Sequence, residues 1–272
     1  MNTIFKYDNE NKIHKFLRLL LITALSLVTL LYVWWIASII LDTAAIPAPP
    51  QVWDAFVRLF SSGDPITGHS MSVHMISSLQ RFGLGFLVTF IVAVPLGLLI
   101  GYSKTLYEFT KPVIEVLRPI APIAWAPIFI LGIWGFAWGP VMVVFVGIFF
   151  PLLTSTIFGV QKIDKNLIDA SKTLGANKMQ IFYKVMFPCT IPYIMNGIKV
   201  GLGIGWMCII AAEMISVEGK GLGFFIYSAA SMGGWPFVFV GIILISILGL
   251  LTIGVFEYIH KIVTKRVGME NE

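Results

Sequence analysis

Four ionisable side chains stand inside or beside long apolar runs of this sequence, where a charge could do chemistry. Glu115, Glu213 and Glu257 lie near the ends of such runs, and Lys199 lies a little deeper. An ionisable group within a membrane marks an ion or substrate path, whereas one at the end of a span is simply solvated. The shallow positions favour solvated ends for the three glutamates. For Lys199 they favour a side chain that reaches the membrane surface, with attraction of an anion as the alternative.

Residue types for catalysis or metal binding are present, but they lack the spacing that such sites need. No G-x-x-x-x-G-K-[ST] nucleotide motif occurs, and the glycine clusters at 201–205 and 220–224 lack the strand-turn-helix setting of a dinucleotide site. Cys189 and Cys208 share one apolar segment, as small buried hydrophobic residues do. The histidines show no ligand spacing; they are His14, His69, His74 and His260. We therefore expect no catalytic residue, no cofactor bound by this chain and no metal, and the chain is not predicted to be an enzyme.

The elements that must position these residues are long and apolar. The 272-residue chain is 57% hydrophobic and 12% charged, with a mean hydropathy of +0.88. Apolar runs of about 20 residues recur, which is the length of a membrane span, and lipid offers backbone groups no partner outside a helix. The sequence predicts an all-α integral membrane protein with a single six-span domain over residues 17–260. The predicted spans are Leu17 to Leu41, Gln80 to Gly101, Pro112 to Trp134, Pro140 to Val160, Cys189 to Ala212, and Pro236 to His260.

Basic residues set the predicted orientation of these spans. With the N-terminus inside, most of the 19 lysines and arginines fall in cytoplasmic segments, Arg118 among them. Three stay outside, namely Arg58, Arg81 and Lys220. Because cytoplasmic loops carry the excess of positive charge, we predict cytoplasmic tails at 1–16 and 261–272. Basic residues spread over four separate cytoplasmic segments indicate the orientation of the spans, so nucleic acid is not an expected partner.

Two patterns in the sequence concern helix packing. Between the first two spans, apolar residues follow Pro49 and Pro50 at helical spacing, which predicts an amphipathic helix on the outer membrane surface; they are Trp53, Phe56, Val57 and Phe60. Small residues at four-residue spacing mark the second and fifth spans and let helices approach closely; they are Ala93, Gly97, Gly101, Gly197, Gly201 and Gly205. Packing within this chain is the favoured interpretation of these stripes, with a subunit interface or a path wall as the alternative.

The third span cannot be a regular helix. It contains Pro112, Pro119, Pro122 and Pro127, and each proline removes an amide and crowds the preceding turn. Because broken backbone at membrane depth must be covered by protein or line a water-filled cavity, we expect this segment to face the interior of the assembly. Kinks without a function are the alternative.

One polar stretch, residues 161–187, interrupts the apolar pattern. A first short helix is predicted to end at Gly175, and Asn177 with Gln180 resembles a capping box that opens a second helix. The second helix carries Ile181 and Phe182 and is predicted to end where Pro188 turns the chain back into the membrane. Apolar side chains on so short a pair need cover. A partner surface and the inner ends of the spans are both possible sources of that cover.

The same stretch resembles the cytoplasmic loop of ABC importer permeases, with Asp169-Ala170-Ser171, then Gly175, then Pro188. Asp169 and Ser171 differ from the E-A-A pattern of that loop. Further segments fall in the order seen in the nitrate, sulfonate and taurine subfamily: Pro47 to Pro50, Ser78 to Arg81, Arg118-Pro119, Phe150-Pro151, Ala212-Glu213 and Gly221 to Gly223. The resemblance covers roughly residues 45–260 and implies a type I ABC importer permease fold in a prokaryotic inner membrane.

The resemblance implies a function and a set of partners. Residues 161–187 would be coupling helices that rest on a separate ATPase subunit, and the coupling residues would be Asp169, Ala170, Leu174, Gly175, Ala176 and Phe182. Two ATPase subunits would hydrolyse ATP, a second copy of the permease would complete the path, and an external binding protein would deliver a small, anionic solute. We expect Pro122, Trp125, Trp206 and Glu213 to line that path. A secondary transporter or a channel without an ATPase is the alternative.

Overall fold

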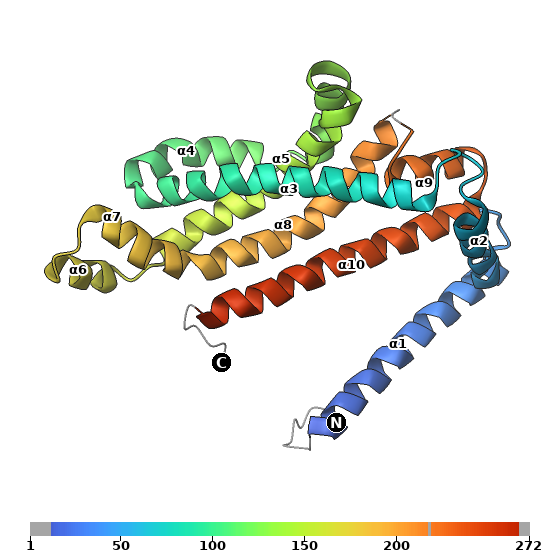
Figure 1. Ribbon diagram of the computed structural model, residues 1–272, viewed down its shortest axis with the longest axis horizontal. Coiled ribbons are helices and arrows are strands. Elements are labelled where there is room, and N and C mark those ends of the chain that lie inside the picture. Colours follow the sequence, from blue (N-terminus) through green and yellow to red (C-terminus); the bar gives the residue numbers. More distant parts are fainter. Residues whose placement is uncertain (1–11, 217–218, 267–272) are drawn as a thin grey trace.

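The computed structural model describes residues 12–216 and 219–266, which form helices joined by turns and short loops (Figure 1). The long helices are α1 (Lys12–Leu41), α3 (Met71–Tyr102), α5 (Gly135–Gln161), α8 (Phe187–Ile215) and α10 (Trp235–Arg266). The shorter ones are α2 (Pro49–Ser62), α4 (Lys104–Leu117), η1 (Pro122–Trp125), η2 (Pro127–Ile133), α6 (Lys165–Thr173), α7 (Lys178–Ile181), η3 (Phe182–Met186) and α9 (Leu222–Ser231). The prediction of an all-α integral membrane protein is confirmed.

The number of spans agrees with the prediction. Within the described residues, five helices are long and apolar enough to cross a membrane, and one bent pair can supply a sixth span. In that pair, Lys104–Leu117 and Pro122–Ile133 meet at 85°. Proline at 119 and 122 accounts for the break, because neither residue can donate the amide that a continuous helix needs. The pair begins at Lys104 rather than at the predicted Pro112, which lies inside α4.

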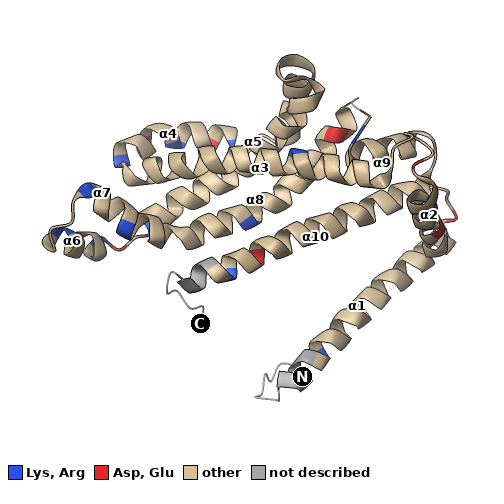
Figure 2. Cartoon of the chain, in the orientation of Figure 1, with Lys and Arg blue, Asp and Glu red and all other residues tan. Residues whose placement is uncertain are grey.

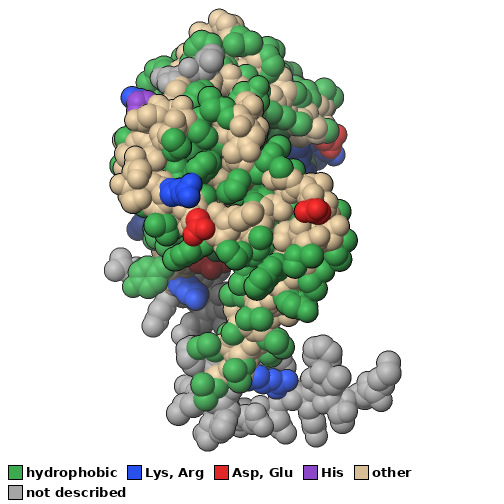
Figure 3. Space-filling view, turned by 90° about the vertical axis from the view of Figure 1, so that its right-hand side faces the viewer, with side chains coloured by type: hydrophobic (Ala, Val, Ile, Leu, Met, Phe, Trp, Pro, Cys, Tyr) green, Lys and Arg blue, Asp and Glu red, His purple; other side chains and the backbone are tan. Residues whose placement is uncertain are grey.

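The spans run between two ends of the molecule. α6 and α7 lie at one end and α2 and α9 at the other (Figure 1); we call them the α6 end and the α9 end. Charged side chains are sparse along the spans between them (Figure 2). Seen from the α9 end, the surface is mostly hydrophobic or uncharged (Figure 3). These features fit a bundle whose sides face lipid.

The core forms where α5 packs against α3 on one side and α8 on the other. A Cβ atom at Gly97 of α3 would lie 2.7 Å from the Cβ of Thr156, and one at Gly201 of α8 would lie 2.7 Å from Cγ2 of Ile148. No side chain fits at those positions, so the glycines let the three helices approach closely. The stripes pack within this chain, which confirms the favoured interpretation.

A second apolar cluster joins α2, α9 and α10 at the α9 end. Val52, Ala55 and Leu59 form the buried side of α2. The predicted stripe lies beside this buried side: Phe56 is half-buried and packs against the cluster, whereas Trp53 is 66% and Phe60 52% exposed. An apolar outer side suits a helix that lies on the membrane surface, as predicted.

α1 stands apart from the other spans and diverges from α10 toward its N-terminal end (Figure 1). The most apolar part of Leu17–Leu41 is 0% buried. Near its C-terminal end, Trp34 stacks on Phe239 of α10 with ring centroids 5.3 Å apart. Lipid is the natural neighbour of such a helix.

One predicted boundary is wrong. Pro188 does not separate the second short helix from the fifth span, because α7, η3 and α8 form one helical run, Lys178–Ile215, of 38 residues. The π-helical turns of η3 precede Pro188, which sits in the first turn of α8, where a missing amide is tolerated. Residues 12–16 are helical and continue α1, and residues 261–266 are helical and continue α10; the cytoplasmic location of the tails stays a prediction. The remaining tail residues, 1–11 and 267–272, lie outside the described residues.

Candidate functional site

The first candidate site is the helix pair α6 and α7, which lies at the α6 end. The Asp164 carboxylate accepts a hydrogen bond of 2.9 Å from the Asn166 amide and so caps α6. Gly175 follows the end of α6 with φ of +82°, a left-handed conformation that glycine adopts at little cost. Asn177 and Gln180 then form the predicted capping box, with bonds of 2.8 and 2.9 Å. Each signal depends only on neighbouring residues. The structure places Gly175 and the Asn177–Gln180 box as predicted, and it adds the cap at Asp164.

The predicted coupling residues differ in their exposure. Asp169 and Ala170 are exposed, and the Asp169 carboxylate accepts a 2.8 Å bond from Lys172 of the same helix. Leu174 is 88% exposed. Ala176 and Phe182 are half-buried and pack against the core of the bundle. The span ends that lie at the α6 end therefore cover part of the pair and leave Leu174 uncovered.

Leu174 belongs to a group of large apolar side chains exposed on this pair and the turn that follows. Met179 is 63% exposed, Tyr183 62% and Leu167 46%. At a membrane-facing position such exposure would be ordinary, but α6 also carries exposed Lys165, Asp169 and Lys172. A surface that mixes exposed leucine with charges is typical of a protein contact.

The second candidate site is a buried carboxylate at the α9 end. Glu213 of α8 is 0% exposed. The Ser78 hydroxyl donates to both of its oxygens at 2.7 and 3.0 Å, and Arg81 Nη1 donates to Oε1 at 3.0 Å. The Gly223 amide donates to Oε2 at 3.0 Å. The prediction of a solvated Glu213 is wrong, because a cation and two neutral donors take the place of water. We call this group, with the backbone of 221–223, the Glu213 cluster.

Backbone geometry lets the chain close around this carboxylate. Gly221 has φ of +116°, and a Cβ there would lie 2.5 Å from Cδ of Glu213. Arg81 Nη1 also donates to the Lys220 carbonyl at 3.0 Å, and the Leu222 amide donates to the Ser78 hydroxyl at 2.8 Å. The cluster thus ties α3, α8 and the start of α9 together.

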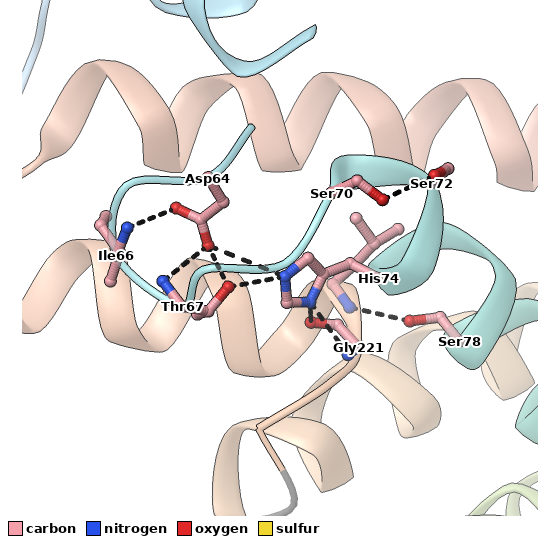
Figure 4. Close-up of polar contacts among 9 residues, drawn as sticks. Asp64, Ile66, Thr67, Ser70, Ser72, His74, Ser78 and Gly221 are labelled. Atoms are coloured by element: carbon pink, nitrogen blue, oxygen red, sulfur yellow. Dashed lines mark hydrogen bonds and ion pairs between the residues drawn. The ribbon is translucent and has the colours of Figure 1, made fainter. Parts of the chain in front are cut away.

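A buried histidine extends the cluster to the loop that precedes α3 (Figure 4). His74 Nδ1 lies 3.1 Å from the Gly221 carbonyl oxygen, and Nε2 lies 2.9 Å from the Thr67 hydroxyl. Thr67 donates in turn to Asp64, which also accepts the Ile66 amide at 2.9 Å. Asp64 and His74 are 3% and 0% exposed. Sequence spacing could not show this network, because Ser78 and His74 lie far from Glu213 along the chain.

The residues predicted to line a path do not form one surface. Trp206 is 5% exposed, stacks on Phe82 at 4.7 Å and donates from Nε1 to the Thr252 hydroxyl at 2.8 Å. It joins α8 to α3 and α10. Trp125 is half-buried and stacks on Phe129 at 6.1 Å. Pro122 lines a groove of about 430 Å³ between η1, α5 and α8.

Lys199 and Glu257 form an ion pair between α8 and α10. Their Nζ and Oε1 atoms lie 2.5 Å apart, and their side chains are 60% and 47% exposed. The pair lines a groove of about 530 Å³ with Met195, Phe256 and His260. Glu257 is therefore exposed as predicted, and Lys199 is held by a partner that the sequence did not indicate.

Metal binding has no structural support within the described residues, where no three His, Cys, Asp or Glu side chains gather closely enough to hold an ion. Cys208 is buried and Cys189 half-buried, and both are free thiols. The expectation of no metal and no cofactor stays a prediction.

Comparison with known proteins gives consistent similarities. Residues 93–268 match the family described as binding-protein-dependent transport system inner membrane component. The nitrate import permease NrtB of a Synechocystis species is 31% identical over 88% of this chain and 88% of its own length. The taurine transport permease TauC of Escherichia coli is 29% identical over 83% of this chain and 82% of its own length.

A solved structure supports the same fold. An inward-facing structure of the MetNI methionine ABC transporter contains a chain that superposes with a TM-score of 0.61 at 20% identity, covering 70% of this chain and 94% of that one. At that identity the likeness concerns the fold alone.

Proposed function

This chain belongs to the family of binding-protein-dependent transport system inner membrane components, and from that membership we propose that it forms the path of an ATP-driven importer for a small anionic solute. It is a permease subunit and not an enzyme. Membership in the family also makes it a multi-pass protein of the inner membrane. The solute class is suggested by relatives named for nitrate and taurine. Nitrate is a small anion, and taurine carries an anionic sulfonate group.

The observation that carries this proposal is the exposed surface of α6 and α7. Leu174 is 88% exposed beside a turn in which Gly175 has φ of +82°, a conformation that glycine adopts at little cost. Because α7 continues into α8 without a break, a partner that binds there would act directly on a span. A free loop would not transmit such a displacement.

The proposal includes the following assembly. Two ATPase subunits contact Asp169, Ala170, Leu174, Gly175, Ala176 and Phe182 from the cytoplasm, and they bind and hydrolyse ATP. Both termini and the α6 end are cytoplasmic. A second copy of the chain completes the path, to which Pro122 and Trp125 contribute, and a binding protein delivers the solute at the α9 end. The chain itself binds no cofactor.

Cross-linking tests the contact with the ATPase. Leu174→Cys is introduced into a chain whose two native cysteines are replaced by alanine, and a thiol-reactive photo-cross-linker is attached in native membranes. Capture of a nucleotide-hydrolysing subunit is expected. Leu250→Cys is the matched control, because Leu250 is an exposed leucine too, at 71%, but lies on the span α10.

Transport separates the proposal from its alternative. Uptake into proteoliposomes is expected only when the ATPase, the binding protein and ATP are all present. Uptake by the purified chain alone under an ion gradient would instead support a secondary transporter. Absence of any ATPase adduct at residue 174 would contradict the proposed coupling surface.

A further inference from the structure

We propose that Arg118, at the break of the third span, makes the groove between η1, α5 and α8 an anion-selective subsite. The sequence placed Arg118 in a cytoplasmic loop. The structure instead places it at the C-terminal end of α4, directly before the bend to η1. This inference deepens the proposed function, on which its biological meaning rests.

The depth of Arg118 is the first argument. α4 begins at Lys104, next to the end of α3, and folds back along α3 toward the α9 end (Figure 1). Its rise of about 1.5 Å per residue carries Arg118 about 20 Å from that starting point. A guanidinium so far from the end of the spans is costly in lipid and is expected to face protein or water.

The groove supplies such surroundings. Its volume is about 430 Å³, and Arg118 and Pro122 line it together with Thr154 and Ser155 of α5 and Asn196 and Val200 of α8. These residues lie in the interior of α5 and α8, away from the ends of either helix. The groove therefore lies beside the middle of the two spans that form the core of the bundle.

The charge of the groove is the second argument. Arg118 is its one charged lining residue, and the groove contains no carboxylate. Among residues 17–216 and 219–262, no Asp or Glu oxygen lies within ion-pair distance of the guanidinium of Arg118. Two other basic residues of the long spans are paired with carboxylates, Arg81 with Glu213 and Lys199 with Glu257. The adjoining groove, which Arg118 and Thr154 also line, contains Lys111 and Glu115, and these two form an ion pair with each other. Arg118 thus gives the groove between η1, α5 and α8 a net positive charge.

The remaining polar groups fit a small oxyanion. Thr154 and Ser155 carry hydroxyls, although both already donate to backbone carbonyls, Thr154 to Phe150 at 2.8 Å and Ser155 to Tyr193 at 2.6 Å. The Asn196 amide is exposed. A planar guanidinium presents several donors in one fork, and an amide adds a neutral donor beside it. Nitrate and a sulfonate group both present oxygens that such donors recognise.

A thiol placed in the groove tests the proposal without knowledge of the solute. Asn196→Cys is introduced into the full chain with alanine at both native cysteine positions. Open membrane fragments are treated with an anionic sulfonatoethyl or a cationic trimethylammonioethyl methanethiosulfonate, and the two modification rates are compared. Arg118→Gln is expected to lower the ratio of anionic to cationic rates by about fivefold, as loss of a nearby unit charge would.

Matched variants sharpen this measurement. Lys111→Gln removes a charge from the same helix outside the groove, where Lys111 pairs with Glu115, and should leave the ratio unchanged. Arg118→Lys keeps the positive charge and should retain most of the preference for the anionic reagent. The proposal would be overturned if the ratio of anionic to cationic rates were the same in the Arg118→Gln chain as in the chain that keeps Arg118. Failure of the thiol at 196 to react would also overturn it, because a thiol in lipid stays protonated and unreactive.

The rate-ratio test of the subsite and the cross-linking test of the proposed function can fail independently of each other. An ATPase adduct at residue 174 without a change in the rate ratio would overturn the subsite alone. A changed ratio without an adduct would overturn the ATP-driven importer and leave a chain with an anion-selective groove.

Discussion

At the scale of single residues, buried Glu213 and exposed Glu257 differ in how their charges are compensated. Glu213 has no exposed surface and is held by Ser78, Arg81 and the Gly223 amide. Glu257 meets Lys199 where both side chains are about half exposed. Removing one partner of a buried ion pair leaves the other charge without compensation, whereas water replaces the partner of an exposed one.

Glu213→Ala should therefore lower the free energy of unfolding by about 3 kcal/mol, because Arg81 and Ser78 lose their acceptor. Thermal unfolding in detergent, followed by tryptophan fluorescence, measures the change. Glu257→Ala is the control and should leave the unfolding temperature close to that of the parent chain. Equal effects of the two substitutions would mean that the Glu213 cluster contributes no more than a surface pair.

At the scale of elements, glycine positions decide how closely α8 approaches α5. A Cβ at Gly197 would lie 2.8 Å from the Cβ of Ser155 and 3.1 Å from the backbone Cα of Leu152. At Gly203 of the same helix, nothing lies within 4 Å of that position. One helix thus contains a tightly packed and an open glycine, which makes a matched comparison possible.

Gly197→Ala should destabilise the chain by about 1–3 kcal/mol, since α5 and α8 must move apart. Gly203→Ala should stabilise it by up to about 1 kcal/mol, because alanine is the better helix former. Unfolding in detergent compares the two. Destabilisation by Gly203→Ala alone would show that the α5–α8 contact is not the tight one.

The turn between α6 and α7 offers a second comparison at this scale. Gly175 has φ of +82° and no atom within 4 Å of its would-be Cβ, so backbone conformation rather than crowding limits substitution. Gly175→Val should reorient the pair and abolish ATP-driven uptake, because a β-branched residue strongly disfavours positive φ. Gly175→Asn, which tolerates that conformation, should retain most uptake. Full uptake by the valine variant would count against a coupling role for the turn.

The elements also show what the sequence could predict. Asn177, Gln180 and Gly175 act on backbone groups within a few residues, so their pattern was sufficient. The prolines predicted a break in the third span, but the 85° angle depends on packing against α5 and α8. Pro188 was misassigned because a proline in the first turn of a helix and one that ends a helix look alike in sequence.

At the candidate sites, too, the sequence could predict features set by neighbouring residues but not contacts between distant ones. Leu174 was named as a coupling residue from the resemblance alone, because the sequence pattern could not tell whether a partner or the span ends cover the apolar side chains of the pair. The burial of Glu213 was not anticipated, since its partner Ser78 stands 135 residues away. Arg118 was counted among the cytoplasmic basic residues although it lies within the predicted third span, Pro112 to Trp134, because the charge rule does not register where a span is broken.

At the scale of the whole molecule, one side of the bundle lacks a protein neighbour. Val200 and Met207 of α8 are 50% and 75% exposed, although the other sides of this helix are buried. The groove lined by Asn196 and Val200 lies on the same helix. A second copy is expected to cover this side.

Native mass spectrometry of the assembled transporter should therefore find two copies of this chain with two ATPase subunits. Met207→Arg, which places a charge on the exposed side, should reduce the share of complexes with two copies. Leu250→Arg on α10 is the control. A complex with one copy of the chain would contradict the proposed symmetry.

The continuity of Lys178–Ile215 has a mechanical consequence. Thirty-eight helical residues extend about 57 Å at a rise of about 1.5 Å each. If the run pivots as a rigid rod, a tilt of about 5° at one tip sweeps the other by about 5 Å, which is one helical turn. A displacement at the α6 end would then reach Glu213 at the α9 end, with no relay through intervening side chains.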